Sequence, residues 1–164
     1  MSATISDCGR YRYRLGREVG AGTRTAAVIM VNPSTADATD DDATIRKVRG
    51  FCERNGFGRF TVVNKFAFRA TDVRELRTAR DPVGPENDQH IEWAIHNHDA
   101  VIVAWGPLGK LPPHLRRRWM KVAEIAARAK APLTSFGVAK DGHPRHPLML
   151  AYDTPLTPWR PPSS

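Results

Sequence analysis

Four short apolar runs, separated by amphipathic segments, most constrain what this chain can fold into. Such runs are typical of strands that are buried on both faces of a parallel sheet. Between them, apolar residues recur at helical spacing, as Leu115, Trp119 and Val122 do. This alternation predicts a three-layer α/β/α fold with a four-stranded, mainly parallel sheet. The predicted strands are 26–31, 60–63, 100–105 and 132–137, the predicted helices are 43–55, 86–97 and 114–130, and 73–79 is expected to form a short helical turn.

The remaining segments are predicted to extend a single α/β domain, which we place at residues 1–152. Residues 1–10 lack periodicity and are expected to be mobile. The alternation in 11–15 predicts an edge strand within an N-terminal extension of residues 1–25. Residues 153–164 form a proline-rich tail that we expect to be disordered or lightly docked.

The composition favours an anionic partner. Lysine and arginine number 25 against 17 acidic residues, which gives a net charge of +8 and a pI of about 10.1. Nucleic acid is the first candidate, DNA before RNA, followed by a nucleoside or nucleotide, although surface arginines also serve solubility alone. No apolar run approaches the roughly 20 residues of a membrane span, and the N-terminus lacks the apolar core of a secretory signal. We expect a cytoplasmic monomer without a cofactor or membrane contact.

Polar residues follow the predicted strands at the points where the strands end. Asn32, Pro33 and Ser34 follow the first strand, Asn64 closes the second, and the polar loop 143–148 follows the last. Because the carboxyl ends of parallel strands open into one crevice, these residues are predicted to meet around a polar pocket. Taken singly, Asn32 is better explained as a strand-terminating residue that bonds to nearby backbone amides, and Asn64 at a strand end is likewise a common cap.

The same residues resemble the motifs of the uracil-DNA glycosylase superfamily. Asn32-Pro33 is similar to its first motif, Asn64 looks like its base-reading asparagine, and the segment 101–106 resembles its third core strand. The loop 143–148 resembles its second catalytic motif, His-Pro-Ser followed by Pro-Leu. The chain also resembles an uncharacterised bacterial and phage family, a domain of unknown function marked by NPSTAD and GxPRHPL.

Two departures from the superfamily pattern affect the expected site. Met30 stands where the superfamily usually has glycine. An inserted Arg145-His146 leaves either His143 or His146 as the matching histidine.

The resemblance implies a uracil-DNA glycosylase-like fold and hydrolysis of the N-glycosidic bond of a pyrimidine base, normal or modified, in DNA or a related nucleoside. Asn32 would orient water, and His143 or His146 would bond to the departing base. Asn64 would read the base edge, because an amide offers a donor and an acceptor. The residues expected around the base also include Phe51, Phe66, Phe68, Pro33 and Ser34. Those expected to contact nucleic acid are Lys65, Arg69, Lys140, Arg145 and Leu148, with Arg145 or Leu148 filling the gap left by a flipped base.

Two other functions remain open at this point. The pocket could belong to a non-catalytic protein that binds nucleic acid or a modified base. The acidic residues Asp37, Asp40, Asp41 and Asp42 could hold Mg²⁺ in an enzyme that processes nucleotides. We prefer helix capping and a solvated turn as the explanation of these four aspartates, so no metal site is assigned.

Overall fold

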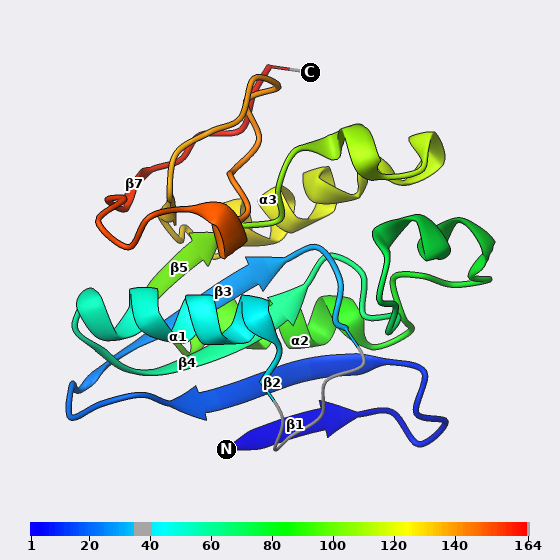
Figure 1. Cartoon of the computed structure of the whole chain (residues 1–164). Helices are drawn as coiled ribbons and strands as arrows, with labels where there is room; N and C mark the ends of the chain where they lie inside the picture. The colour runs from blue at the N-terminus through cyan, green and yellow to red at the C-terminus, as the bar shows by residue number, and fades with distance from the viewer. Residues whose placement is uncertain (35–40, 164) are drawn as a thin grey trace.

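The computed structural model describes residues 1–34 and 41–163. Within that part of the chain, seven strands form one mixed sheet in the order β1-β2-β4-β3-β5-β6-β7 (Figure 1). The α/β class is confirmed, but the expected four-stranded sheet is wrong: four parallel strands, β4, β3, β5 and β6, form only its centre, and antiparallel strands flank them on both sides. The strands are β1 (Ser2–Ile5), β2 (Arg12–Glu18), β3 (Arg24–Met30), β4 (Phe57–Asn64), β5 (Ala100–Val103), β6 (Leu133–Ser135) and β7 (Thr157–Pro158).

The N-terminal segment is more ordered than its sequence indicates. Residues expected to be mobile form β1, which pairs antiparallel with β2, so that Ala3 lies opposite Leu15. The predicted edge strand 11–15 is therefore the second strand from the edge and continues to Glu18. The side chains of β1 are mostly exposed, and its ladder is made by backbone groups, which leave no pattern in the sequence.

Helices cover both faces of the sheet and make three layers (Figure 1). Helix α1 (Ala43–Arg54) packs on one face, and α2 (Asn87–His96) and α3 (Arg118–Arg128) pack on the other. Strand β3 is buried on both faces, because Val28 faces α1 while Ile29 faces α2 and α3. That double burial explains the continuous apolar run in the sequence.

Short 3₁₀ turns complete the connections. They are η1 (Val73–Thr78), η2 (Leu108–Lys110), η3 (Pro113–Leu115) and η4 (Pro147–Met149). The predicted helix 114–130 is divided into η3 and α3, because the amides of Leu115 and Arg116 bond three residues back to Pro112 and Pro113. None of the helices among the described residues combines the length and the apolar character that a membrane crossing requires.

The C-terminal tail, expected to be disordered or lightly docked, is anchored by one tryptophan. Strand β7 pairs with β6, and the Trp159 side chain next to it is only 4% exposed. Its indole Nε1 donates a hydrogen bond to the Gly142 carbonyl at 3.2 Å. The proline-rich composition of the tail does not reveal this contact, because a single aromatic residue supplies the buried area.

Candidate functional site

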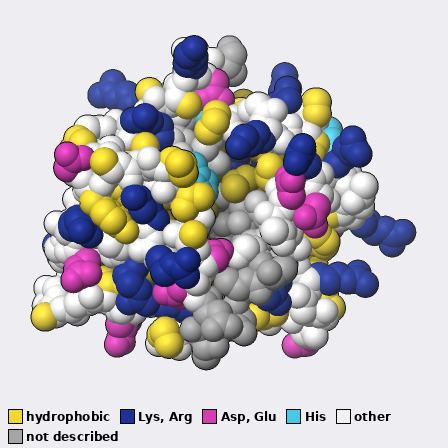
Figure 2. All heavy atoms as spheres, in the orientation of Figure 1, with side chains coloured by type: hydrophobic (Ala, Val, Ile, Leu, Met, Phe, Trp, Pro, Cys, Tyr) yellow, Lys and Arg dark blue, Asp and Glu magenta, His cyan; other side chains and the backbone are white. Residues whose placement is uncertain are grey.

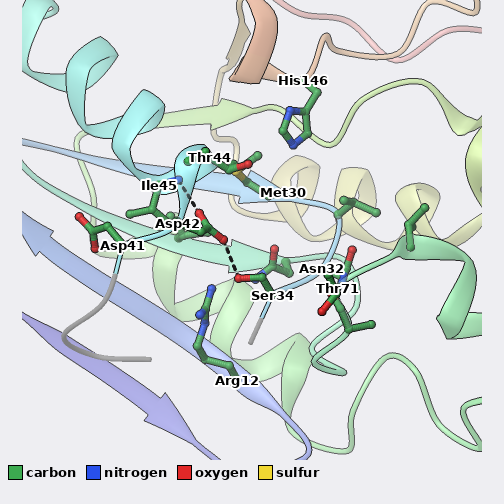
Figure 3. Close-up of a pocket in the computed structure, with 16 residues that line it drawn as sticks. Arg12, Met30, Asn32, Ser34, Asp41, Asp42, Thr44, Ile45, Thr71 and His146 are labelled. Atoms are coloured by element: carbon green, nitrogen blue, oxygen red, sulfur yellow. Dashed lines mark hydrogen bonds between the residues drawn. The ribbon is translucent and has the colours of Figure 1, made fainter. Parts of the chain in front are cut away.

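A cavity of about 690 Å³ opens at the carboxyl edge of β3 and β4, beside the N-terminus of α1 and under the loop that carries His146 (Figure 3). Figure 2 shows a hollow on this face, with Lys and Arg side chains on both sides of it. A volume of this size suits a small-molecule or nucleoside ligand, for which pockets span about 300–1,000 Å³. The lining residues are Arg12, Met30, Val31, Asn32, Ser34, Asp41, Asp42, Ala43, Thr44, Ile45, Val62, Asn64, Ala70, Thr71, Val73 and His146.

Asn64 lines this cavity and carries a buried amide oxygen. It is the last residue of β4 and is 2% exposed, and its Oδ1 has no hydrogen-bond partner within residues 1–34 and 41–163. The backbone at the end of β4 is fixed by Asn87, whose Nδ2 donates to the carbonyls of Asn64 at 2.8 Å and of Lys65 at 3.1 Å. A buried amide oxygen without a partner is costly, so a ligand that offers an N–H or O–H group gains by binding here.

Asn32 lines the same cavity in a fixed orientation. Its Nδ2 donates to the carbonyls of Pro33 at 3.1 Å and Ala70 at 2.9 Å. The amide nitrogen is therefore committed to the backbone, and Oδ1 is the part of the side chain left to accept a hydrogen bond from water or a ligand.

His146 is the loop histidine that faces the cavity. In Figure 3 its imidazole points toward the cavity from the side opposite Arg12. Burial lowers the pKa of His146, with a further lowering from Lys110 and an opposing effect of Asp42. Its Nδ1 accepts a hydrogen bond from the Leu148 amide at 3.2 Å, so the proton of the neutral ring is on Nε2. The ring thus offers one N–H donor.

His143 lies on the other face of the sheet, away from the cavity. Its Nδ1 accepts a hydrogen bond from Trp105 Nε1 at 3.2 Å, and Trp119 and Trp159 also contact the ring. Burial lowers the pKa of His143. The charge of Asp141 opposes this shift, and the charge of Lys65 adds to it. This imidazole is 3% exposed and belongs to the packed interior.

Ser34 and Asp42 form a hydrogen-bonded pair at the cavity wall. Ser34 Oγ donates to Asp42 Oδ2 at 2.5 Å, drawn as a dashed line in Figure 3. The other carboxylate oxygen of Asp42 accepts the Ile45 amide at 2.9 Å and caps α1. The cap preferred from the sequence is therefore present, and it leaves one oxygen of Asp42 directed to Ser34.

The carboxylate of the neighbouring Asp41 is paired with two arginines. Arg17 Nε lies 2.8 Å from one of its carboxylate oxygens, and Arg49 Nη2 lies 3.3 Å from the other. Burial tends to raise the pKa of Asp41, but the bonds and charges of Arg17 and Arg49 outweigh it and lower that pKa. Asp37 and Asp40, the other members of the acidic group, lie outside the described residues. In the described ranges, no three His, Cys, Asp or Glu side chains gather as metal ligands would.

Arg12 is a cavity residue that sequence reasoning missed. It rises from β2 toward Ser34 and Asp42 (Figure 3) and is 2% exposed. Burial lowers the pKa of Arg12 to about 10, while the charge of Asp42 favours the protonated form. The alternation in 11–15 predicts a strand, but it does not indicate that the Arg12 side chain lies on the side of that strand where the cavity forms.

Other predicted base-contact residues do not line the cavity. Phe51 and Phe66 are buried in two separate apolar clusters, and Phe68 is half-buried against Tyr11. Pro33 is buried beside the cavity, where its carbonyl holds Asn32.

The predicted nucleic-acid contacts lie in different surroundings. Lys65 is fully buried, so its ammonium group does not reach a phosphate at the surface. It lies 5.1 Å from the Trp105 ring centre, and burial lowers the pKa of Lys65 to about 7. Arg69 donates to the Gly9 carbonyl at 3.3 Å. The three that are exposed are Lys140, Arg145 and Leu148.

The fold and site together define an α/β protein with a polar cavity at the carboxyl edge of its parallel strands. The chain belongs to the family described as "Protein of unknown function (DUF1643)", which matches residues 12–148. The matched region contains every cavity residue, from Arg12 to His146. No curated protein and no solved structure matches the chain significantly. None of these comparisons links it to the uracil-DNA glycosylase superfamily.

Proposed function

We propose that this protein hydrolyses the N-glycosidic bond of a pyrimidine base, normal or modified, in DNA or in a related nucleoside. The observation that carries the proposal is that Asn32, Asn64 and His146 line one cavity although they are far apart in the chain. Each offers the polar group that one part of the reaction needs. The proposal extends to this chain a chemistry suggested by its motifs.

Base recognition falls to Asn64. Among the described residues its buried Oδ1 has no donor, and we assign that role to the N3–H of a uracil-type base. A base with an acceptor at that position leaves the Asn64 oxygen unpaired, which costs about 1–3 kcal/mol. The site should therefore prefer uracil-type bases to cytosine-type bases.

Bond cleavage needs water on the sugar and stabilisation of the departing base. Asn32 Oδ1 accepts a hydrogen bond from the attacking water and so holds it in place. The Nε2–H of the neutral His146 ring donates to the base oxygen as negative charge develops there. Because a neutral imidazole gives up its proton reluctantly, it stabilises this charge by hydrogen bonding, without protonating the base.

The charge around the cavity suits a nucleic-acid backbone. Arg46 lies in the first turn of α1, Arg145 is adjacent to His146, and Lys110 is near enough to lower the pKa of that histidine. All three cations are exposed, and the chain carries a net charge of +8. Phosphate contacts of this kind fix the position of a strand and make its binding sensitive to salt.

The direct test is release of the base. Single- and double-stranded oligonucleotides that carry uracil or 5-hydroxymethyluracil are incubated with the protein and scored for abasic sites. We expect turnover by the wild type and a loss of at least about tenfold in Asn32→Ala. Asn97→Ala, a change of the same type at the exposed end of α2, is the matched control. Absence of abasic sites over the whole panel would refute hydrolysis.

A second candidate function, binding without catalysis, is favoured by the state of two cavity residues. Asn32 cannot act as a base, and Asp41 is engaged by Arg17 and Arg49. In this case the same oligonucleotides bind in a salt-dependent way without turnover, and Asn64→Leu lowers the preference for the modified base while leaving non-specific affinity intact.

A further inference from the structure

We propose that Ser34 and Asp42 form a proton relay that deprotonates the attacking water. The inference rests on the proposed hydrolysis and assigns to it the base that Asn32 cannot supply. An amide orients water but does not accept its proton, whereas the Ser34–Asp42 pair ends in a carboxylate and lines the same cavity.

The geometry of the pair is that of a strong, oriented hydrogen bond. The 2.5 Å separation of Ser34 Oγ and Asp42 Oδ2 lies within the range of about 2.5–2.7 Å for hydroxyl donors on carboxylates. The Ile45 amide holds Oδ1 of Asp42, so the carboxylate cannot turn away. The Ser34 hydroxyl therefore has its hydrogen directed to the carboxylate, and both residues line the cavity.

Independent features indicate that a ligand occupies the space in front of this pair. Asn64, 2% exposed, lines the same cavity, and its buried Oδ1 has no hydrogen-bond partner among the described residues. Arg12 and His146 approach from opposite sides (Figure 3), and both experience the charge of Asp42. Asp42 thus lines the site, in addition to capping α1.

The relay balances in protons and electrons. As the oxygen of water forms a bond to C1′ of the sugar, one water proton passes to Ser34 Oγ and the Ser34 proton passes to Asp42 Oδ2. The C1′–N bond breaks and its electron pair leaves with the base, which becomes an anion stabilised by His146 Nε2–H. The proton on Asp42 then returns to solvent and the base takes up a proton, so the net reaction consumes one water.

Asp42→Asn separates catalysis from helix capping. Asparagine keeps an oxygen for the Ile45 amide and so keeps the cap, but it cannot accept the relayed proton. Ser34→Ala removes the intermediate hydroxyl, and Ser34→Thr restores it. Asp99→Asn is the matched control, because Asp99 accepts from the Thr25 hydroxyl at 3.2 Å at the opposite edge of the sheet.

The experiment measures kcat and KM for base release from the uracil oligonucleotide, together with the melting temperature of each variant. We expect Asp42→Asn and Ser34→Ala to lower kcat by about 10²–10⁴-fold, the size of a general-base contribution. The loss in Asp42→Asn should fall on kcat while KM stays within about twofold of the wild-type value, a split that a purely structural role would not produce. Ser34→Thr should recover most of the rate, and Asp99→Asn should match the wild type.

The outcomes are distinguishable. Wild-type rates in Asp42→Asn or in Ser34→Ala overturn the relay and leave hydrolysis standing. A wild type without any turnover overturns hydrolysis and the relay together. If Asp42→Asn does not fold, Ser34→Ala decides, because Ser34 does not cap α1.

Discussion

His143 and His146 lie in one loop, yet their imidazoles face opposite sides of the sheet. His143 accepts a hydrogen bond from Trp105 within the packed interior, whereas His146 accepts one from the Leu148 amide and presents Nε2 to the cavity. The two residues, indistinguishable in the motif, should therefore differ in every functional measurement.

The first prediction compares these histidines directly. His146→Ala should lower base release by about 10²-fold, as loss of one donor to a developing oxyanion does, and leave the free energy of unfolding nearly unchanged. His143→Ala should instead lower the free energy of unfolding by at least about 1–3 kcal/mol, because the buried Nε1–H of Trp105 loses its acceptor. Urea denaturation and the base-release assay, run on both variants, check the separation. The reverse pattern would contradict the assignment of His146 to the site.

The second prediction concerns the unpaired oxygen of Asn64. Asn64→Leu replaces the buried amide by an apolar group of similar size. The free energy of unfolding of the unliganded protein should rise by about 1 kcal/mol, while affinity for the uracil oligonucleotide should fall at least fivefold. Calorimetric melting and fluorescence-anisotropy titration measure the two effects. A variant that is both less stable and unaltered in binding would show that Asn64 is a structural residue.

The third prediction follows from the buried amine of Lys65. Its Nζ has no hydrogen-bond partner within the described part of the chain, and burial, aided by Arg118 and opposed by Asp141, lowers its pKa from 10.5 to about 7. Between these values the unfolded chain binds the proton and the folded chain does not, so this residue makes stability rise with pH.

Lys65→Met tests that sign. The difference in free energy of unfolding, wild type minus variant, should increase by about 1.4 kcal/mol per pH unit between about pH 7 and pH 10. Burial raises the pKa of Cys52 from 9.0 to about 12, so this thiol lowers the stability of both proteins above pH 9. Taking the difference between the two proteins cancels this contribution of Cys52. Urea denaturation at several pH values provides the measurement. Parallel pH curves would mean that the Lys65 amine is protonated in the folded protein.

The fourth prediction concerns the C-terminal anchor. Trp159 is 4% exposed and contacts Trp105, Trp119 and His143. Trp159→Ala should lower the free energy of unfolding by about 3–5 kcal/mol. Trp93→Ala, a change at a 36% exposed tryptophan, is the control and should cost much less. Equal effects of the two substitutions would show that the tail is not anchored.

The sequence predicts those helices and strands whose buried apolar residues recur in a regular pattern. The four parallel strands and the three α-helices come from apolar runs and helical spacing, because β3 and α1 bury their patterned side chains. Strands β1 and β7 escape prediction, because backbone pairing makes the first and Trp159 anchors the second.

The site is predictable to the extent that it depends on strand ends. Asn32 and Asn64 meet because β3 and β4 are parallel neighbours. The choice between His143 and His146 needs the path of the loop. The part played by Arg12 needs the face of β2 on which its side chain lies.

The short strand β7 also determines how the sheet ends. Its second residue, Pro158, has no amide hydrogen, and the strand is two residues long, so this margin offers few donors to a strand from another molecule. At the opposite margin, β1 is four residues long and free of proline. Any association of this protein by strand addition should therefore proceed through β1, far from the tryptophan-anchored end.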